Sequence, residues 1–331
     1  MSPSDATVSA TPAEVAAVLA EPSRRFCVTS HRNPDGDALG TLLALGRALG
    51  RRGADVVLAH PDADALPDDL GFMMRADERI RPELPDDIAE RTLVCLDCAS
   101  EQRLWDGEPH RAAALVVNVD HHGDNTEFGD LNLVEPDASS TAEVLVHVLE
   151  AGGWEIAPDE ALPLYVALVT DTGRFGNRSA GREAHRVAGL LIESGADPAA
   201  VARRLYEQQP FARSVLLGRA LAGARLLAGG RLVVARLDED DYEAAGDDDT
   251  EGIVEVLRGV EGAAVAALVR RAGPPGAWRV SLRAVDGTDV AAIARLGGGG
   301  GHRAAAGFST ASSPDDLFAW LERQLPAQMD G

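Results

Sequence analysis

The sequence predicts an α/β protein with an N-terminal, mainly parallel sheet that carries helices on both faces, then a helical connector and a smaller mixed α/β domain. Three observations support this fold class. Short apolar runs alternate with amphipathic helical patterns up to about residue 197, which is typical of a parallel sheet with covered faces. After residue 197 the pattern changes to a long helical stretch, and short strands and helices follow it. The length of 331 residues suits two domains rather than one.

The first domain is predicted to span residues 12–197, after a disordered tail of small polar residues at 1–11. Its first helix begins at a capping box, in which Thr11 is followed three residues later by Glu14. The remaining elements follow from apolar periodicity and from Gly and Pro breaks. They are strand 25–30, helix 38–49, strands 55–59, 92–96 and 114–119, and helices 140–150, 161–169 and 182–194.

The connector is predicted at residues 198–224 as one helical region that Pro210 interrupts. The second domain then covers residues 225–331. Alternating apolar residues and glycine-rich turns predict a small mixed sheet there. Its predicted elements are strands 225–227 and 231–237, helices 239–245 and 253–257, strands 264–269 and 278–284 joined by a turn at 273–276, helix 290–296, strand 304–308 and a helix from residue 314.

Composition limits the classes of function. The chain has 53 acidic and 31 basic side chains, every basic one an arginine, and a formal net charge of −22. Non-specific binding to long duplex nucleic acid needs an excess of basic side chains, so this class is disfavoured. No apolar run approaches the roughly 20 residues of a membrane-spanning helix, and the first residues do not resemble a signal peptide. With only three cysteines, these features lead us to expect a cytoplasmic protein without a membrane partner.

Acidic residues and histidines gather where predicted strands or helices end. They form four clusters, which are His31 with Asp35 and Asp37, Asp97 alone, Asp120 with His121 and His122, and Asp171 alone. Ligands of open α/β sheets bind beyond the carboxyl ends of the strands, so we expect the clusters to converge on one cleft. The alternative for the first cluster is a polar loop with a helix-capping aspartate, and for the single Asp97 capping and function are equally well supported.

The ligand types at these four clusters indicate metal ions. So many carboxylates in one cleft would repel one another unless divalent cations lay between them. Carboxylates with some imidazole favour Mn²⁺ or Mg²⁺ over structural Zn²⁺, which would recruit cysteine. Six such ligands suit two ions that share one carboxylate and lie ~3.5–4 Å apart, an arrangement used for phosphoester hydrolysis. The sequence therefore predicts a dinuclear metal centre in the first domain.

A glycine run in the second domain suggests an anion-binding segment. Five glycines at 297–301 precede His302 and a predicted strand. Consecutive glycines allow the backbone to approach an anion closely, although such a run can also be a flexible linker. Arg283, near the end of a strand of the same domain, is a candidate phosphate clamp, with an ordinary surface arginine as the alternative.

These motifs resemble those of the DHH phosphoesterase superfamily, which is named for the triplet found here as Asp120, His121 and His122. All four N-terminal signatures occur in order, and the glycine run with His302 looks like the second-domain signature called DHHA1. The chain is similar to the NrnA-type subgroup, which consists of bacterial oligoribonucleases that also dephosphorylate 3′-phosphoadenosine 5′-phosphate (PAP). The resemblance implies a phosphoester hydrolase acting on short RNA oligonucleotides or small nucleotides.

The resemblance also implies a role for each site residue. One ion would be held by His31, Asp35 and Asp97, and the other by Asp37, Asp97, His121 and Asp171. His122 would contact the scissile phosphate and Asp120 would orient its neighbours. Gly299, Gly300, Gly301 and His302, with Arg283, would bind the far end of the substrate. Mn²⁺ is the expected ion, with Mg²⁺ or Co²⁺ as alternatives.

Two other functions and one partner are left open by the sequence. Some relatives in the subgroup cleave cyclic di-AMP or its linear product pApA, so a phosphodiesterase for these nucleotides is the main alternative. A nucleotide sensor without catalysis is a remote alternative, because such a sensor would have lost metal ligands and here all six are present. A homodimer is neither indicated nor excluded.

Overall fold

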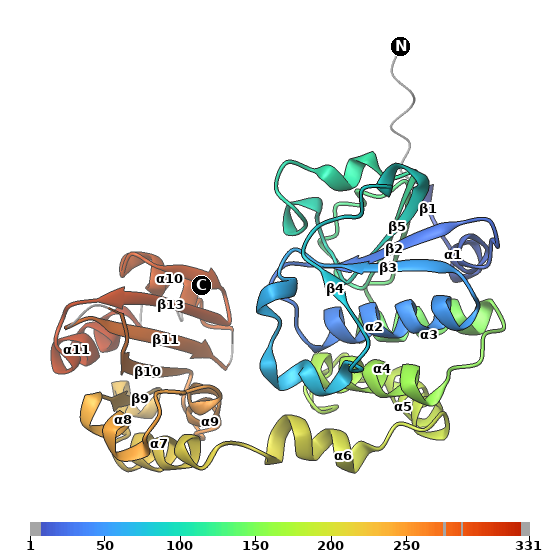
Figure 1. Cartoon of the computed structure of the whole chain (residues 1–331). Helices are drawn as coiled ribbons and strands as arrows, with labels where there is room; N and C mark the ends of the chain where they lie inside the picture. The colour runs from blue at the N-terminus through green and yellow to red at the C-terminus, as the bar shows by residue number, and fades with distance from the viewer. Residues whose placement is uncertain (1–7, 274–275, 286, 326–331) are drawn as a thin grey trace. The chain divides into compact units, whose positions relative to one another are not determined.

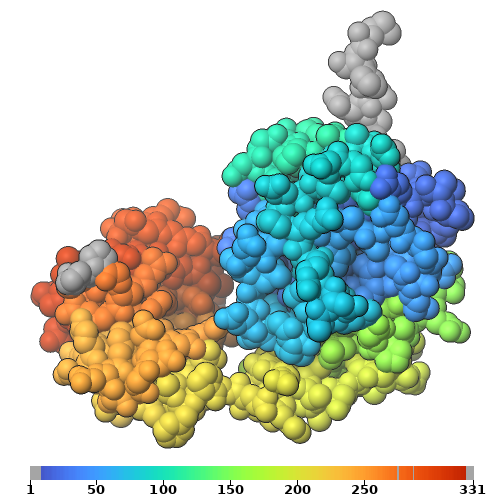
Figure 2. All heavy atoms as spheres, viewed as in Figure 1, coloured from blue at the N-terminus to red at the C-terminus, as the bar shows by residue number. Residues whose placement is uncertain are grey.

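The computed structural model describes residues 8–273, 276–285 and 287–325 and divides into two compact units, Met1–Gln208 and Gln209–Gly331 (Figures 1 and 2). The boundary falls inside the stretch expected to form the connector. Helix α6 (Pro198–Ala202) and one turn of π-helix (Arg203–Glu207) belong to the first unit, and α7 (Phe211–Ala222) begins the second. The helical stretch is interrupted at Pro210, as the sequence predicts.

The first unit contains a seven-stranded sheet in the order β1-β7-β6-β5-β2-β3-β4, and every neighbouring pair is parallel. All its strands therefore end at the same edge, which is where the predicted clusters lie. The strands are β1 (Val8–Ser9), β2 (Arg25–Ser30), β3 (Asp55–Ala59), β4 (Ile80–Arg81), β5 (Arg91–Leu96), β6 (Leu115–Asp120) and β7 (Leu131–Val134).

Helices cover the two faces of this sheet unevenly. The α-helices pack on one face, where they form the main core with side chains such as Phe26, Val94 and Val117 (Figure 1). The other face is covered by short 3₁₀ turns and loops, whose Leu104 packs against Cys27 and other strand residues. The helices of the unit are α1 (Pro12–Leu19), α2 (Gly36–Arg51), α3 (Thr141–Ala151), α4 (Pro158–Asp171), α5 (Arg182–Glu193) and α6.

The sequence missed three strands of this sheet and misjudged one terminal segment. Strands β4 and β7 lack a recognisable apolar run of strand length, and β1 pairs with β7 in parallel. The expectation of a disordered tail up to residue 11 is therefore wrong for residues 8–11, because Val8 and Ser9 form β1 and Thr11 caps α1. Residues 1–7 lie outside the described part of the chain.

The second unit is a mixed six-stranded sheet in the order β12-β13-β11-β10-β9-β8. Only β9 and β10 pair in parallel, and apolar side chains pack against helices on both faces. The strands are β8 (Arg225–Leu227), β9 (Leu232–Leu237), β10 (Val265–Arg271), β11 (Trp278–Ala284), β12 (Gly300–His302) and β13 (Ala305–Thr310). The helices are α7, α8 (Glu239–Ala245), α9 (Ile253–Arg258), α10 (Val290–Leu296) and α11 (Pro314–Gln324).

The glycine run differs from the expected loop. Its last two residues begin strand β12, which pairs with β13 so that Gly300 lies opposite Gly307 and His302 opposite Ala305. A strand made of glycines gives no apolar signal, so the sequence could not indicate it. The expected turn between β10 and β11 includes Pro274 and Pro275, which lie outside the described residues. Within the described ranges, no helix is long and apolar enough to cross a membrane.

Candidate metal centre and substrate-binding residues

The structure brings all six predicted metal ligands together at the carboxyl edge of the first sheet. Three groups of residues each place one potential ligand atom per residue within 4.8 Å of the others. One group has the membership that the family resemblance implies for the first ion, and a second contains three of the four ligands implied for the other ion, without Asp97. The groups are His31, Asp35 and Asp97; Asp37, His121 and Asp171; and Asp97, His121 and His122.

The first group lies between the ends of β2 and β5. His31 follows β2 directly, and its Nε2 atom is 3.3 Å from Oδ2 of Asp97. Asp35 is the N-cap of α2, and its Oδ1 atom accepts hydrogen bonds from the backbone N–H groups of Asp37 and Ala38. Only one oxygen of Asp35 is used in this way. Capping and ligation are therefore compatible at Asp35, since the second oxygen remains available for a cation.

The second group depends on close helix packing. Gly36 begins α2, and a Cβ atom there would overlap the side chain of Thr170 near the end of α4. This close approach brings the first turn of α2, with Asp37, to the end of α4, where Asp171 lies. His121 Nε2 is 3.5 Å from Oδ2 of Asp171 and 4.0 Å from Oδ2 of Asp37.

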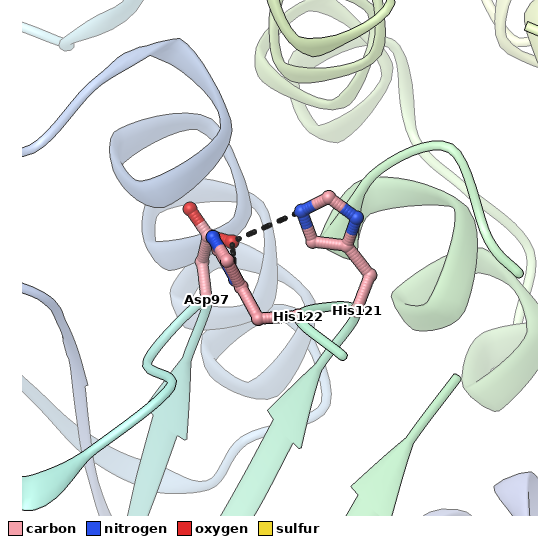
Figure 3. A group of neighbouring side chains, drawn as sticks. All are labelled: Asp97, His121 and His122. Atoms are coloured by element: carbon pink, nitrogen blue, oxygen red, sulfur yellow. Dashed lines mark ion pairs between the residues drawn. The ribbon is translucent and has the colours of Figure 1, made fainter. Parts of the chain in front are cut away.

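Asp97 connects the two groups. It follows β5 with a φ of 56°, a left-handed conformation that is uncommon for a residue other than glycine. Figure 3 shows the imidazoles of His121 and His122, after β6, turned towards its carboxylate. Oδ1 of Asp97 is 3.7 Å from His121 Nε2 and 3.6 Å from His122 Nδ1, while Oδ2 is near His31. Each carboxylate oxygen of Asp97 thus faces a different group of ligands.

Two contacts in the centre were not predicted. Helix α3 begins beside the carboxylates, and the N–H groups of Thr141 and Ala142 donate to Asp37 at 2.6 and 3.0 Å. The Thr141 hydroxyl donates to Asp97 Oδ1 at 2.9 Å. The positive end of a helix thereby stabilises both buried carboxylates. The sequence indicated a helix start here but did not indicate which carboxylates it would face.

The pKa values of the clustered carboxylates reflect burial and the crowding of charges. Burial, followed by repulsion from Asp97 and other carboxylates, raises the pKa of Asp37 well above its ordinary value. Burial also raises the pKa of Asp171, to about 6. Burial opposes ionisation of Asp97, but hydrogen bonding to His31 and the neighbouring imidazoles outweigh burial and lower its pKa. Cations would relieve this repulsion, so the donor set fits two oxygen-preferring divalent ions.

Asp120 is fully buried behind the centre and orients His122. Its Oδ1 atom accepts from His122 Nδ1 at 2.8 Å and from the backbone N–H of His121 at 2.8 Å. Asn125, which the sequence did not single out, donates to the other oxygen at 2.5 Å. The hydrogen bond with Asp120 raises the pKa of His122 to about 9. His122 therefore carries a proton at neutral pH in this arrangement, with Nε2 directed away from Asp120.

In the second unit, the glycines of the run have different structural roles. The N–H of Gly299 already donates to the carbonyl of Ala294 at 2.9 Å, and a Cβ atom at Gly299 would overlap the carbonyl of Gly307. Gly301 has a φ of 140°, and a Cβ there would lie 2.6 Å from the carbonyl of Ala305. A Cβ at Gly300 would meet nothing within 4 Å. Close packing therefore explains why Gly299 and Gly301 have no side chain, whereas a larger residue would fit at Gly300.

The structure places His302 and Arg283 on one face of the second sheet. Both are cross-strand partners of Ala305, so all three side chains project to the same side. His302 is exposed, and only the small Ala305 lies between it and Arg283. The Arg283 guanidinium pairs with Glu255 at 2.8 Å and lines a cavity of about 550 Å³. Its positive charge is thus partly neutralised within the unit.

Comparison with known proteins defines the class to which this fold and this site belong. The pattern of the DHH family, N-terminal domain, matches residues 25–168, and that of the DHHA1 domain matches residues 229–324. Together these two matches cover most of the chain. The chain belongs to the DHH/DHHA1 phosphoesterase family.

Among individual proteins, the chain is 35% identical over 316 residues to the bifunctional oligoribonuclease and PAP phosphatase NrnA of Thermus thermophilus, covering 95% of this chain and 92% of that protein. The fold is shared with an exopolyphosphatase-related protein from Bacteroides fragilis, with a TM-score of 0.81, 22% identity and 96% of each chain covered. A crystal structure of exonuclease RecJ bound to manganese has a TM-score of 0.50 and 18% identity, covering 96% of this chain and 94% of that one.

Proposed function

We propose that this protein is a cytoplasmic, dinuclear-metal phosphoesterase that hydrolyses short oligoribonucleotides and small nucleotides such as PAP. The observation that carries the proposal is the grouping of six carboxylate and imidazole ligands around Asp97 at the edge of the sheet. The substrate class is supported by 35% identity to a relative named as an oligoribonuclease and PAP phosphatase, over nearly the whole of both chains.

The proposed metal ligands follow from the two groups described above. His31, Asp35 and Asp97 would hold one ion, and Asp37, Asp97, His121 and Asp171 the other. Such ions supply an acidified water molecule and neutralise charge on the phosphoryl oxygens when they are bound. We assign Mn²⁺ because the donors are oxygen-rich with two imidazoles, and because RecJ, which shares the fold, binds manganese. Mg²⁺ and Co²⁺ are the alternatives.

The remaining residues of the centre, Asp120, His122 and Thr141, would orient side chains and supply a hydrogen-bond donor for the substrate. Asp120 fixes the ring of His122 through Nδ1. Because the pKa of His122 is raised to about 9, Nε2 would carry a second proton at neutral pH, directed away from Asp120. That proton can be donated in a hydrogen bond to a phosphoryl oxygen, where negative charge increases during the reaction. Thr141 and the first turn of α3 hold Asp37 and Asp97 in place. His122 is thus assigned to substrate contact and Asp120 to its orientation.

We assign recognition of the distal end of the substrate to the second unit. His302 and Arg283 share a face with Ala305 between them, and a Cβ atom at Gly300, two residues before His302, would meet nothing within 4 Å. Imidazole, guanidinium and glycine backbone are all suited to phosphate. Because Glu255 already pairs with Arg283, a phosphate there must share or replace that partner.

Comparison of substrates tests the proposal. We expect kcat/KM in Mn²⁺ to be high for short oligoribonucleotides and for PAP, lower for cyclic di-AMP and pApA, and negligible for all of them in EDTA. A preference for cyclic di-AMP or pApA would assign the alternative phosphodiesterase function. Binding of these nucleotides by the Mn²⁺-loaded protein without turnover of any of them would contradict the proposal in favour of a sensor.

A further inference from the structure

Arg103 lies against the metal centre but has no role in the assignments above. It ends the 3₁₀ turn Glu101–Arg103, six residues after Asp97, and is half-buried. Its Nη2 atom is 2.8 Å from Nδ1 of His31, the ring whose Nε2 faces Asp97. Its carbonyl accepts from the N–H of Arg32 at 2.8 Å, which fixes the turn beside the end of β2.

Among the residues that the structure describes, the guanidinium of Arg103 has no acidic partner, whereas those of its neighbours do. Arg32 pairs with Asp106 at 3.0 Å, and Arg111 pairs with Glu101 at 2.7 Å. Within the described part of the chain, Arg103 forms no ion pair, and its side chain is hydrogen-bonded to His31. The guanidinium of Arg103 is always charged and has five N–H donors, but its only side-chain hydrogen bond in the described residues is with His31. This lack of a carboxylate partner is unexpected in a protein of net charge −22.

The contact with His31 cannot persist when that ring ligates a cation. A guanidinium only donates, so Nδ1 must offer a lone pair to accept from Arg103. The same Nδ1 atom is 2.8 Å from the carbonyl oxygen of Arg32, which only accepts. When Nε2 gives its lone pair to a cation, the ring proton resides on Nδ1 and is donated to Arg32. Nδ1 then has nothing to offer Arg103.

We propose that Arg103 is a further substrate-binding residue, whose guanidinium binds a substrate phosphate when His31 ligates a cation. The inference rests on the proposed function. It adds the positively charged Arg103 side chain to the substrate-binding residues, on the His31 side of the metal ligands. A phosphate group fits because the planar fork of a guanidinium matches two of its oxygens. Guanidinium donors that face no acceptor would otherwise lie half-buried, which is unfavourable.

Binding of adenosine 5′-monophosphate, measured by calorimetry, tests this inference without relying on turnover. With Mn²⁺ present, Arg103→Gln should weaken nucleotide binding by roughly 10- to 100-fold, the loss typical of a charge-assisted hydrogen bond. In EDTA the same substitution should change binding less than threefold, as should Arg111→Gln in either condition. Adenosine, which lacks the phosphate, should bind wild type and Arg103→Gln equally. Arg103→Lys keeps the charge but loses the fork, so it should give an intermediate loss if the Gln variant does not fold.

Several outcomes would overturn the role of Arg103. Unchanged affinity for the monophosphate in Mn²⁺ would exclude phosphate binding. An equal loss in EDTA would exclude a role that depends on metal ligation by His31. If Arg103→Gln lost as much affinity for Mn²⁺ as for the nucleotide, Arg103 would act by positioning the metal ligand His31 rather than by binding phosphate. Hydrolysis of short oligoribonucleotides by the wild type is a separate measurement, so failure of the inference remains distinguishable from failure of the proposed function.

Discussion

Replacing Asp120 with asparagine should lower the pKa of His122 and weaken catalysis. The hydrogen bond with Asp120 holds that pKa at about 9, against an ordinary value of 6.5. Asp97 contributes to the same shift, and the His122 side chain is 34% exposed. Solvent therefore screens part of the interaction, and we expect a fall of about 1 to 2 pKa units rather than the whole difference.

The substitution Asp120→Asn also removes an acceptor from a fully buried group. The introduced amide would present its N–H₂ group either to His122 or to Asn125, both of which donate to Asp120 in the wild type. One of these partly buried donors would lose its partner, at a cost of about 1 kcal/mol in folding stability, the lower end for an unsatisfied donor. Residues that orient a site in this way typically affect activity by roughly 10- to 100-fold, so kcat should fall within that range.

The assay is an NMR titration of the imidazole C–H signals in metal-free protein, with His122→Gln used to assign the resonance. Asp124→Asn serves as a matched control, because Asp124 is an exposed carboxylate four residues along the chain. An unchanged pKa of His122 in Asp120→Asn, with the fold retained, would refute the orientation argument. Equal falls in both variants would show a general charge effect instead.

Two further predictions concern stability. Hydrogen bonding to Glu135, with help from Glu183, raises the pKa of His147 to about 8, above its ordinary 6.5, so its stabilisation is complete below pH 6.5 and is lost as pH rises through 8. Wild type should therefore lose about 1 kcal/mol of unfolding free energy between pH 6 and pH 9, after allowance for solvent screening. Urea denaturation at the two pH values measures this loss. An equal loss in His147→Gln would contradict the assignment to His147. Gly301→Ala should destabilise the second unit by about 1–3 kcal/mol, because its Cβ would meet the Ala305 carbonyl, whereas Gly300→Ala should keep wild-type stability. Comparable losses of thermal stability in the two variants would show that Gly300 is also required by packing.

The grouping of the candidate metal ligands could be predicted from sequence because it follows from topology. Parallel strands end at one edge of a sheet, so residues that follow β2, β5 and β6 meet there whatever lies between them in the chain. His31, Asp97 and His121 all obey this rule. Asp171 follows a helix instead, and its position depends on the close contact between Gly36 and Thr170, which no local pattern reveals.

Residues that support the centre were harder to predict. Thr141 acts through a backbone N–H and a hydroxyl, groups that nearly every segment contains, so the sequence does not distinguish it. Asn125 and Arg103 lie in irregular segments whose path depends on tertiary packing. In the second unit, strand β12 was missed because glycines carry no apolar pattern.

The number of Mn²⁺ ions bound per chain, with and without Asp97, tests the central claim most directly. Calorimetric titration of metal-free wild type should give two ions per chain. Asp97→Asn should weaken both, because Asp97 faces both groups of ligands. Asp137→Asn, a substitution of an exposed carboxylate near the site, should leave both in place. A single ion in the wild type, or two tightly bound ions in Asp97→Asn, would contradict a dinuclear centre that shares this carboxylate.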